Sequence, residues 1–461
     1  MIGFGDTVAA VSTPRGKGGV AVIRVSGAEA IAVCDRVFRA VSGKALAETE
    51  ARRAVFGYIF DGDECIDDGI VTIFRAPRSF TGEDTVEISC HGGVLVTEAV
   101  LGVILTAGAR PAEAGEFTRR AFVNGKMGLS SAEALASLLE ANNRNQMRLS
   151  RAGLEGKLSA RCREIYGRLC DILGSLYAKI DYPDEDLSGL SAEDLQSMLA
   201  TERAELLKLA ATYKSGHAVA EGILTVICGR PNAGKSSLYN RIVGRDAAIV
   251  TDVAGTTRDI LEETVPFGGV TLRLCDTAGL RGGDVDAVER IGIERAEERL
   301  ADAELILAVF DGSVAPVDED LALIARLSSM KNLVIPVVSK SDIGTERIAV
   351  LLEEAFGSFA SVTVREERGL VLLESKVRER FLDGALDLRN DPVVASARQY
   401  ASIARALEAL EAALSSLDGG FAEELCAADI ERAMQAVGEL DSRAVSDDIV
   451  SNIFSRFCVG K

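Results

Sequence analysis

The sequence predicts a multidomain α/β protein: an α+β N-terminal domain, a discontinuous helical domain, and an inserted α/β domain with a mostly parallel sheet. Three observations predict this organisation. Short β-type runs alternate with turns over residues 1–124, helical spacing dominates 125–222 and 385–461, and β and α signals alternate over 223–384. The economical account is one helical domain, in two parts, that receives the segment 223–384 as an insertion.

Composition sets the class of protein. The chain has 461 residues, of which 48% are hydrophobic and 26% charged, enough for about three domains with their own cores. No apolar run has the length of a membrane span and the first residues lack the basic start of a signal peptide, so a cytoplasmic protein without membrane contact is expected. The net charge of −19 argues against a chain that coats nucleic acid by itself. It leaves room for a local basic patch, or for a partner that carries most of the contact.

Cysteine and histidine usage argues against a disulfide framework and against a zinc site. Nine cysteines occur without a C-x-x-C pair, and the chain has only two histidines. His91 and His217 are therefore interpreted as structural or solvated residues.

The N-terminal segment contains two clear strands, at residues 20–25 and 55–60, and Asp61-Gly62-Asp63 is a turn signal.

In the helical segments, Ser131 is expected to cap a helix, and the acidic residues 181–186 interrupt the helical pattern. A second long helix follows that break. After residue 384 one apolar stripe predicts a helix that stops at Gly419-Gly420; its members are Ile403, Leu407, Leu410, Leu414 and Leu417.

A complete phosphate-binding loop lies inside the inserted segment. It reads Gly229-Arg230-Pro231-Asn232-Ala233-Gly234-Lys235-Ser236, follows an apolar run at 223–228, and precedes a predicted helix that begins with Ser237. Strand, loop and helix in this order let backbone N–H groups converge on phosphate oxygens at a helix N-terminus. Lys235 can reach the terminal phosphates, and the Ser236 hydroxyl is placed for magnesium.

Further strands are expected at 271–275, 304–310 and 333–338, which predicts a parallel sheet covered on both faces, with ligands at the carboxyl ends of its strands. Asp276-Thr277-Ala278-Gly279 closes one of these strands, so Asp276 is expected to hold magnesium through water and the Gly279 amide to sense the γ-phosphate. The loop Thr251-Asp252-Val253-Ala254-Gly255-Thr256-Thr257 offers a threonine to the magnesium shell and is expected to order with the triphosphate. This is the pattern of a Ras-like G domain.

A base-reading motif, Ser339-Lys340-Ser341-Asp342, follows the strand at 333–338. Asp342 can accept the N1 and N2 protons of guanine, which adenine does not offer. The usual first residue is Asn, so Ser339 is expected to lose one contact to base or loop, with weaker nucleotide binding. Residues 362–365 are a degenerate form of the last G-domain motif.

Leu280 occupies the position where many GTPases place a water-orienting glutamine, and no arginine finger is obvious, although Arg258 and Arg281 remain candidates. Asn232 and the threonine-rich loop could surround a monovalent cation with oxygens. Such a cation would offset the charge that develops on the phosphates.

Further motifs lie outside the inserted segment. They are Asp6-Thr7, Gly19-Val20, Arg24-Val25-Ser26-Gly27, Ser79-Phe80-Thr81-Gly82-Glu83-Asp84, Cys90-His91-Gly92-Gly93, Gly115-Glu116-Phe117-Thr118-Arg119-Arg120-Ala121-Phe122, Asn124-Gly125-Lys126 and Cys458-Val459-Gly460-Lys461. With these motifs the chain resembles the MnmE (TrmE) family of bacterial tRNA-modifying GTPases over essentially its full length.

The resemblance implies a homodimer whose N-terminal domain dimerises and binds 5-formyl- or 5,10-methylene-tetrahydrofolate. It also implies an FAD-dependent MnmG-type partner, with tRNA contacted mainly together with that partner. The family installs an aminomethyl-type group, such as carboxymethylaminomethyl, at carbon 5 of the wobble uridine of certain tRNAs. A folate supplies the one-carbon unit, and glycine or ammonium the nitrogen. Its G domains pair when GTP and potassium are bound, which activates hydrolysis.

The resemblance also assigns residues. Ser236 and Thr257 would bind magnesium, and Asn232, Thr251, Val253 (backbone) and Thr256 would surround potassium. Glu289 matches the catalytic glutamate that orients the attacking water. Arg24, Glu87, Lys126 and Lys461 correspond to folate-binding positions, where cations can pair with folate carboxylates and a carboxylate can bind the pterin ring. Cys458 matches a terminal cysteine for which a catalytic thiol and a structural or positioning role both stand as interpretations.

Two other functions stay open at this stage. A GTP-switched RNA-binding assembly or ribosome-maturation factor would carry the same kind of G domain without modification chemistry. The second of these other functions is that of a folate-dependent transferase with a regulatory GTPase attached. The N-terminal motifs and the terminal Cys458-Val459-Gly460-Lys461 favour the modification GTPase over a pure switch.

Overall fold

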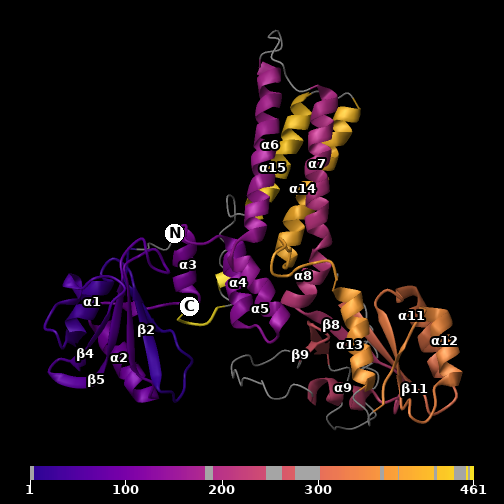
Figure 1. Ribbon diagram of the computed structural model, residues 1–461, viewed down its shortest axis with the longest axis horizontal. Helices are drawn as coiled ribbons and strands as arrows, with labels where there is room; N and C mark the ends of the chain where they lie inside the picture. The colour runs from indigo at the N-terminus through magenta and orange to yellow at the C-terminus, as the bar shows by residue number, and fades with distance from the viewer. Residues whose placement is uncertain are drawn as a thin grey trace, which may run out of the picture. The chain divides into compact units, whose positions relative to one another are not determined.

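The structure is a computed structural model that divides into two units (Figure 1). It describes residues 5–181, 191–244, 262–275, 302–363, 368–382, 384–419, 423–440, 453–454 and 457–460. Unit 1 consists of residues 1–136 and 438–461, and unit 2 of residues 137–437. Unit 1 therefore draws on two separate stretches of sequence, whereas unit 2 is one continuous stretch.

Unit 1 is built on a seven-stranded sheet of order β3-β4-β5-β6-β2-β1-β7, in which only β1 and β7 pair in parallel. Its strands are β1 (Val8–Val11), β2 (Val20–Ser26), β3 (Phe38–Ala40), β4 (Ala54–Asp61), β5 (Glu64–Phe74), β6 (Thr85–His91) and β7 (Arg110–Pro111). The strands expected at 20–25 and 55–60 are confirmed as β2 and β4. The expected turn at Gly62, with φ of 59°, joins β4 to β5.

The two faces of this sheet differ because alternate residues of a strand point to opposite sides. Ile23 and Ile88 lie in the apolar core that α1 and α2 cover, whereas Arg24 and its neighbour Glu87 lie on the other face. The helices of unit 1 are α1 (Ala30–Val37), η1 (Leu46–Glu48, a 3-10 turn), α2 (Val94–Thr106), α3 (Glu116–Val123) and α4 (Leu129–Leu139).

Residues near the C-terminus pack into unit 1. Ile453, Phe454 and Phe457 form one apolar cluster with Leu129 and Ala132 of α4. Removing this segment would therefore expose the buried side of α4.

The last described residues are attached to the first strand of unit 1. Val459 pairs with Ala114, and the Ser12 hydroxyl donates a hydrogen bond to the carbonyl of Gly460, 3.0 Å away. Gly460 has φ of 102°, and a Cβ at this position would lie 2.1 Å from the Val11 carbonyl oxygen. Only glycine fits this approach.

Helix α4 begins earlier than expected. The sequence predicts a cap at Ser131, but α4 starts at Leu129. Ser130 and Ser131 are buried in its first turn, and the Ser130 hydroxyl donates to the carbonyl of Leu440, 2.9 Å away, which ties α4 to the end of α15. A tertiary contact has replaced the local capping role.

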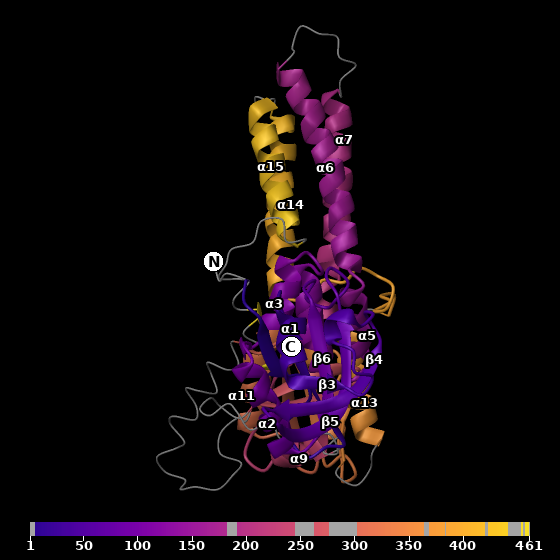
Figure 2. The ribbon, with the colours of Figure 1, turned by 90° about the vertical axis from the view of Figure 1, so that its left-hand side faces the viewer.

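Unit 2 contains a set of long helices and a sheet domain. Helix α7 packs against α6 and α14, and the long helices are best seen in Figure 2. The described helices of this part are the long α6 (Lys157–Asp181), α7 (Ala192–Ala211), α14 (Ala397–Asp418) and α15 (Glu423–Leu440), together with the shorter α5 (Arg144–Leu154) and α8 (Tyr213–Ala220). The acidic break expected at 181–186 begins where α6 ends, and residues 182–186 are outside the described ranges. Ser191 and Asp194 then form a reciprocal capping box that starts α7.

The apolar stripe expected at 403–417 is the buried side of α14. Ile403 and Leu410 are fully buried, and Ala406 lies between them on the same side. The other leucines of the stripe are half-buried. The helix ends at Asp418, one residue before Gly419, so the first glycine of the expected stop is its C-cap.

The sheet of unit 2 has the order β13-β12-β11-β8-β10-β9, and all its neighbours are parallel except β9 and β10. Its strands are β8 (Ile223–Cys228), β9 (Glu262–Phe267), β10 (Val270–Cys275), β11 (Leu305–Asp311), β12 (Val334–Ser339) and β13 (Ala360–Ser361). Strand β8 has the expected bounds. Strands β11 and β12 begin one residue later than expected and both extend by one residue, because Asp311 and Ser339 still pair in the ladder.

Helices cover both faces of this sheet. Core residues of α9 and α13 pack on one face, and those of α11 and α12 on the other. The helices are α9 (Lys235–Gly244), α11 (Asp318–Leu327), η3 (Ser328–Met330, a 3-10 turn), α12 (Glu346–Phe356) and α13 (Arg368–Phe381). The predicted multidomain α/β class with a mostly parallel, doubly covered sheet is confirmed. No helix in the described ranges combines the length and apolar character needed to cross a membrane.

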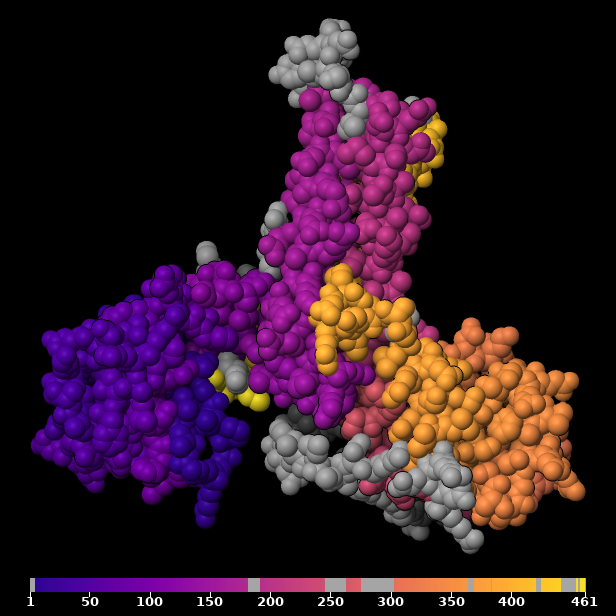
Figure 3. All heavy atoms as spheres, in the orientation of Figure 1, coloured from indigo at the N-terminus to yellow at the C-terminus, as the bar shows by residue number. Residues whose placement is uncertain are grey.

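The apolar core of this sheet continues into the helical part of unit 2 through Leu149 of α5 and Val219 of α8. The segment 384–396, which leads from α13 to α14, lies against the start of α6 (Figure 3): the Lys157 ammonium donates to the carbonyl of Arg389. Helical part and sheet domain are thus packed together as well as linked by chain.

Candidate functional site

The phosphate loop at 229–236 joins the end of β8 to the start of α9. Three of its residues have positive φ: Gly229 at 147°, Asn232 at 62° and Gly234 at 100°. A Cβ at position 229 would lie 2.3 Å from the carbonyl oxygen of Val309, so the loop passes directly over β11 and requires glycine there. The first N–H groups of α9 have no partner inside the helix, which makes this end of the helix suited to an anion.

Lys235 turns back from α9 into this loop. Its ammonium donates to the carbonyls of Gly229 and Arg230, at 2.9 and 2.8 Å. Burial lowers the pKa of Lys235 below its ordinary value. A half-buried positive charge therefore lies within the loop that the sequence assigns to phosphate, while Ser236 and Ser237 are exposed beside it.

The structure brings the base-reading motif to the phosphate loop. Ser339 ends β12, and its hydroxyl lies 2.5 Å from the carbonyl of Ala233 and 3.1 Å from that of Phe310. Lys340, with φ of 51°, donates to the carbonyl of Asn232 at 3.3 Å. Two motifs about a hundred residues apart thus share hydrogen bonds across the carboxyl ends of β8 and β12.

The contact of Ser339 with the loop refines the sequence-based expectation. Ser339 does reach the loop through Ala233. The contact that serine loses relative to asparagine is therefore not the contact to the loop. A hydroxyl carries a single proton, and Ala233 is the nearer acceptor. A neighbouring base can therefore not receive that proton, whereas an asparagine amide would have two to donate.

Asp342 is held from the segment that carries the degenerate last motif. The Thr363 hydroxyl donates to its carboxylate at 3.1 Å, and Arg241 of α9 donates to the Thr363 carbonyl at 2.8 Å. Val364 and Arg365, which complete that motif, lie outside the described residues.

The remaining predicted residues of the nucleotide site lie outside the described part of the chain. They are Thr251, Asp252, Val253, Ala254, Gly255, Thr256, Thr257, Asp276, Thr277, Ala278, Gly279 and Glu289, together with Leu280, Arg258 and Arg281. The strands on either side are described: β9 begins at Glu262, after the threonine-rich loop, and β10 ends at Cys275, before Asp276. The turn between these strands is held by α5, since the Asn145 amide donates to the carbonyl of Gly269 at 2.9 Å.

Two of the predicted folate residues, Arg24 and Glu87, are direct cross-strand neighbours on β2 and β6. The Arg24 guanidinium donates to one Glu87 carboxylate oxygen at 2.8 and 3.0 Å. It also lies over the rings of Phe80 and Phe117, 5.2 and 5.5 Å from their centroids. Such a guanidinium is fixed on both sides, by charge and by aromatic faces.

Lys126 is tied to the same loop that carries Phe80. Its ammonium donates to the Pro77 carbonyl at 2.9 Å, and its stem lies 3.2 Å from where a Cβ of Gly82 would be. Lys461, the fourth predicted residue, lies outside the described residues.

A buried charge network beneath this loop escaped the sequence analysis. Arg120 is fully buried and pairs with Asp6, Glu83 and Glu116 at 2.8 to 3.1 Å. Arg110 pairs with Asp6 and Glu116 as well and, with Arg120, holds the pKa of Asp6 below its ordinary value. Only the Glu116–Arg120 pair, four residues apart on α3, gave a local signal. Arg110 lies six residues before Glu116, and Asp6 and Glu83 lie far from α3 in sequence.

Cys458 is exposed in the segment that Gly460 attaches to unit 1. Its neighbour Val459 makes the bridge to Ala114, so the backbone around the thiol is fixed even though its side chain faces solvent.

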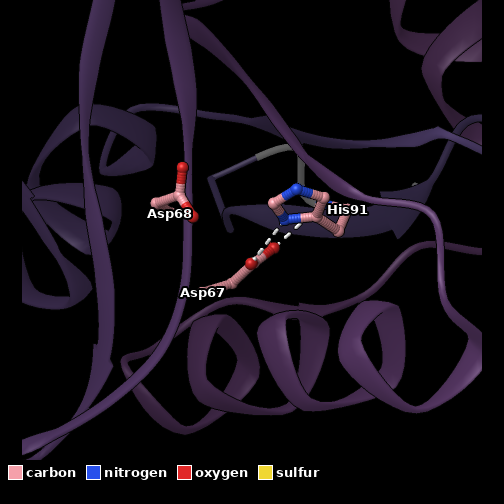
Figure 4. Close-up of side chains that lie close together, drawn as sticks. All are labelled: Asp67, Asp68 and His91. Atoms are coloured by element: carbon pink, nitrogen blue, oxygen red, sulfur yellow. Dashed lines mark hydrogen bonds and ion pairs between the residues drawn. The ribbon is translucent and has the colours of Figure 1, made fainter.

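His91, expected to be structural or solvated, belongs to a group on β5 and β6 whose ligand atoms are close enough for one metal ion, with Asp67 and Asp68 (Figure 4). The Asp67 carboxylate lies 2.7 Å from Nδ1 of His91 and accepts from its backbone N–H at 2.8 Å. Hydrogen bonds thus already engage Asp67, and its hydrogen bond to the ring, together with its charge, raises the pKa of His91. These hydrogen bonds make the group a structural link between β5 and β6.

His217 of α8 joins the helical part of unit 2 to the sheet. Its imidazole lies 3.2 Å from the Glu221 carboxylate and 2.8 Å from that of Glu304, which precedes β11. Glu221 and Glu304 together raise the pKa of His217 to about 9, against the opposing effect of burial. Glu304 also accepts from the N–H of Leu224 in β8, so the imidazolium is a structural charge.

Two known protein families match this chain, one in its N-terminal part and one in the rest. Residues 7–126 match the family described as GTP-binding protein TrmE N-terminus, and residues 129–458 match the MnmE helical domain. A phosphate-loop domain inserted into that helical domain, behind such an N-terminal domain, defines a class of multidomain GTP-binding proteins.

Full-length relatives agree with this match. Proteins named tRNA modification GTPase MnmE are 35% identical over 458 residues in Clostridioides difficile (strain 630) and 39% identical over 467 residues in Geobacillus kaustophilus (strain HTA426). The alignments cover 99% of this chain and 99% of each relative. A relative of the same name from Lactococcus lactis subsp. cremoris (strain MG1363) is 38% identical over 457 residues, covering 99% of this chain and 98% of the relative. The chain belongs to the MnmE (TrmE) family of tRNA modification GTPases.

Proposed function

We propose that this protein hydrolyses GTP as part of a complex that adds a carboxymethylaminomethyl or aminomethyl group to carbon 5 of the wobble uridine of certain tRNAs. One observation carries the proposal: the phosphate loop and the base-reading motif share hydrogen bonds through Ser339 and Lys340, in a chain that aligns over 99% of its length with tRNA modification GTPases.

The nucleotide would bind across the carboxyl ends of β8 and β12. Lys235 would contact its terminal phosphates, the N–H groups of residues 232–237 would surround them, and Asp342 would accept hydrogen bonds from guanine. Ser236 and Thr257 would hold Mg²⁺, with Asp276 acting through water. Residues 251–257 and 276–279 would complete the contacts to the triphosphate.

Hydrolysis would depend on potassium. Asn232, Thr251, Thr256 and the backbone of Val253 would supply oxygens to K⁺, which would offset the charge developing on the phosphates when two G domains pair. Glu289 would orient the attacking water in place of the glutamine that Leu280 replaces.

The N-terminal domain would bind a tetrahydrofolate derivative, which would supply the one-carbon unit. The residues suit such a ligand, because Arg24, Lys126 and Lys461 offer cations to carboxylates and Glu87 offers a carboxylate to ring N–H groups. The pairing of Arg24 with Glu87 and its place over two aromatic rings keep the guanidinium oriented. Cys458, fixed beside this domain, would act as a thiol or as a positioning residue.

The proposed domain boundaries follow from the sequence pattern and the family resemblance. Residues 1–124 would form the dimerising, folate-binding domain, 125–222 and 385–461 the helical domain, and 223–384 the G domain. The homodimer would work in the cytoplasm with an FAD-dependent MnmG-type partner, and tRNA would be bound mainly with that partner.

GTP hydrolysis in potassium chloride and in sodium chloride at equal ionic strength tests the proposal. We expect strong stimulation by potassium, and loss of this stimulation in Asn232→Ala. Equal rates in both salts would remove the potassium mechanism and favour a GTP-switched assembly factor.

A further inference from the structure

A buried carboxylate lies between the two nucleotide motifs. Strand β11 runs between β8 and β12, and it continues to Asp311, which pairs with Ser339 in the ladder. Strand β8 stops at Cys228, opposite Ala308. The end of β11 therefore extends past the end of β8, alongside the phosphate loop, and the side chain of Asp311 is 6% exposed there.

One oxygen of this carboxylate holds the base-reading motif. The Lys340 ammonium lies 2.6 Å from Oδ2 of Asp311 and also donates to the carbonyl of Asn232 in the phosphate loop. The other oxygen, Oδ1, accepts from the N–H and the hydroxyl of Ser313, at 2.9 and 2.5 Å. These two bonds fix the rotamer of Asp311, so its second oxygen points at Lys340.

The same carboxylate also contacts the phosphate loop. A terminal nitrogen of Arg230 lies 3.6 Å from Oδ2 of Asp311, and Nε of Arg230 lies 3.4 Å from the buried carboxylate of Asp320. Two cations, one from each motif, thus meet at one aspartate. Among the described residues, Asp320 pairs with the cation of the phosphate loop and not with Lys340, and it accepts the first-turn hydrogen bond of α11.

Asp311 is charged despite its burial. Burial opposes ionisation, but the hydrogen bonds from Lys340 and Ser313 outweigh it and bring the pKa of Asp311 below its ordinary value. A buried carboxylate that loses its charge leaves its cationic partners without compensation, which is costly.

We propose that Asp311 is a positioning residue for guanine nucleotides, which holds Arg230 of the phosphate loop and Lys340 of the base-reading motif in fixed relation to each other. The inference rests on the proposed nucleotide site and deepens it. Asp311 binds neither phosphate nor base. It acts through the two cations, so it sets how tightly a guanine nucleotide is held, and GDP and GTP are affected alike.

Asp311→Asn tests this, because asparagine keeps the shape of the side chain and removes its charge. We expect release of fluorescent GDP to accelerate by roughly tenfold or more, and the affinities for GDP and GTP to fall by the same factor. KM for GTP should rise while hydrolysis at saturating GTP changes much less. Asp320→Asn is the matched control: it removes a buried charge beside Arg230 but leaves both Arg230 and Lys340 paired with Asp311, so GDP release should stay within about twofold.

A double-mutant cycle with Lys340→Gln separates positioning from general loss of structure. If Asp311 acts through Lys340 as well as through Arg230, Asp311→Asn accelerates GDP release by a smaller factor in the Lys340→Gln background than in the wild type. Additive effects, unchanged GDP release in folded Asp311→Asn, or equal losses in Asp311→Asn and Asp320→Asn would overturn the inference.

Should Asp311→Asn fail to fold, Ser313→Ala replaces it, because it removes one of the two hydrogen bonds that orient the carboxylate and keeps both its charge and the bond from the backbone N–H. Faster GDP release then supports the inference, and unchanged release refutes it. If the unmodified protein binds no guanine nucleotide, the proposed site itself is wrong, which is a different outcome from any of these.

Discussion

At the scale of single residues, Ser339 shows how one hydroxyl limits a binding site. Its proton is used within the protein, on the carbonyl of Ala233 in the phosphate loop. The neighbouring Gly234 has no side chain, and a Cβ there would lie 3.1 Å from the Ser339 side chain, so the space beside Ser339 is tight.

Ser339→Asn is therefore expected to tighten GDP binding several-fold, because an asparagine amide can keep the bond to Ala233 and still donate to the base. Ser339→Ala, which removes the loop contact, should weaken binding by about 1 kcal/mol. Titration with fluorescent GDP measures both. Equal affinities of the serine and asparagine forms would mean that the second donor is irrelevant here.

At the scale of elements, two polar side chains are among the contacts that connect the helices of unit 2 to its sheet. Asn145 of α5 holds the β9–β10 turn, and His217 of α8 holds Glu304 at the start of β11. Neither contact touches the phosphate loop. Both attach to strands that lead into it or into the neighbouring nucleotide motifs.

The His217 contact gives a stability that depends on pH. The pKa of His217 is raised from 6.5 to about 9 in the folded protein, so the contribution is complete below about pH 6.5 and disappears as pH rises through about 9. The shift corresponds to a contribution on the order of 3 kcal/mol. We expect the difference in free energy of unfolding between the wild type and His217→Gln to shrink from pH 6.5 to pH 9.5. A difference that stays constant over this range would contradict the assignment.

A spectroscopic check accompanies this prediction. The chain has only two histidines, so the imidazole resonances of His91 and His217 can be assigned with a single variant. The His217 resonance should titrate near pH 9. Titration near 6.5 would show that the two carboxylates do not hold the imidazolium.

Local patterns explain which elements could be predicted. Strand β8, the phosphate loop and the stripe of α14 follow from residues adjacent in sequence or spaced by one helical turn. Strand β9 was missed because it carries two glutamates and Pro266 at the edge of the sheet, where pairing on one side overrides a weak strand pattern. The start of α4 was misplaced because Ser130 bonds to Leu440, about 300 residues away.

In the candidate site, too, local patterns could be predicted and contacts between distant residues could not. Each motif could be recognised where it stands in the sequence, but the residues that join the motifs could not. Asp311 carries no motif, and its role depends on Arg230 and Lys340, which approach it because β8, β11 and β12 are parallel neighbours with their carboxyl ends at the same edge of the sheet. Arg120 is similar, since Asp6 and Glu83 reach it from other elements.

At the scale of the whole molecule, unit 1 depends on residues from near the C-terminus. Gly460→Ala should detach this segment, because the added Cβ would collide with the Val11 carbonyl. We expect unit 1 to lose about 2 kcal/mol or more of stability. Hydrogen exchange of the β1 amides should report the loss, while GDP affinity stays unchanged.

Gly43→Ala is the matched control for this substitution. Gly43 also has positive φ, at 71°, and belongs to unit 1, but a Cβ there meets nothing within 4 Å. Its replacement should cost only the backbone strain, about 1 kcal/mol. Equal effects at both positions would show that the terminal segment adds nothing to unit 1.

The divided sequence of unit 1 also sets an order of events during synthesis. The strands of its sheet and helix α4 leave the ribosome first, but Ile453, Phe454 and Phe457 follow only after about 300 residues of unit 2. At roughly 5 to 20 residues per second, the apolar side of α4 stays uncovered for about 15 to 60 s. During that interval the nascent chain presents Leu129 and Ala132 to whatever binds exposed apolar surface. Translation speed and chaperone supply should therefore matter more for unit 1 than its place at the start of the chain suggests.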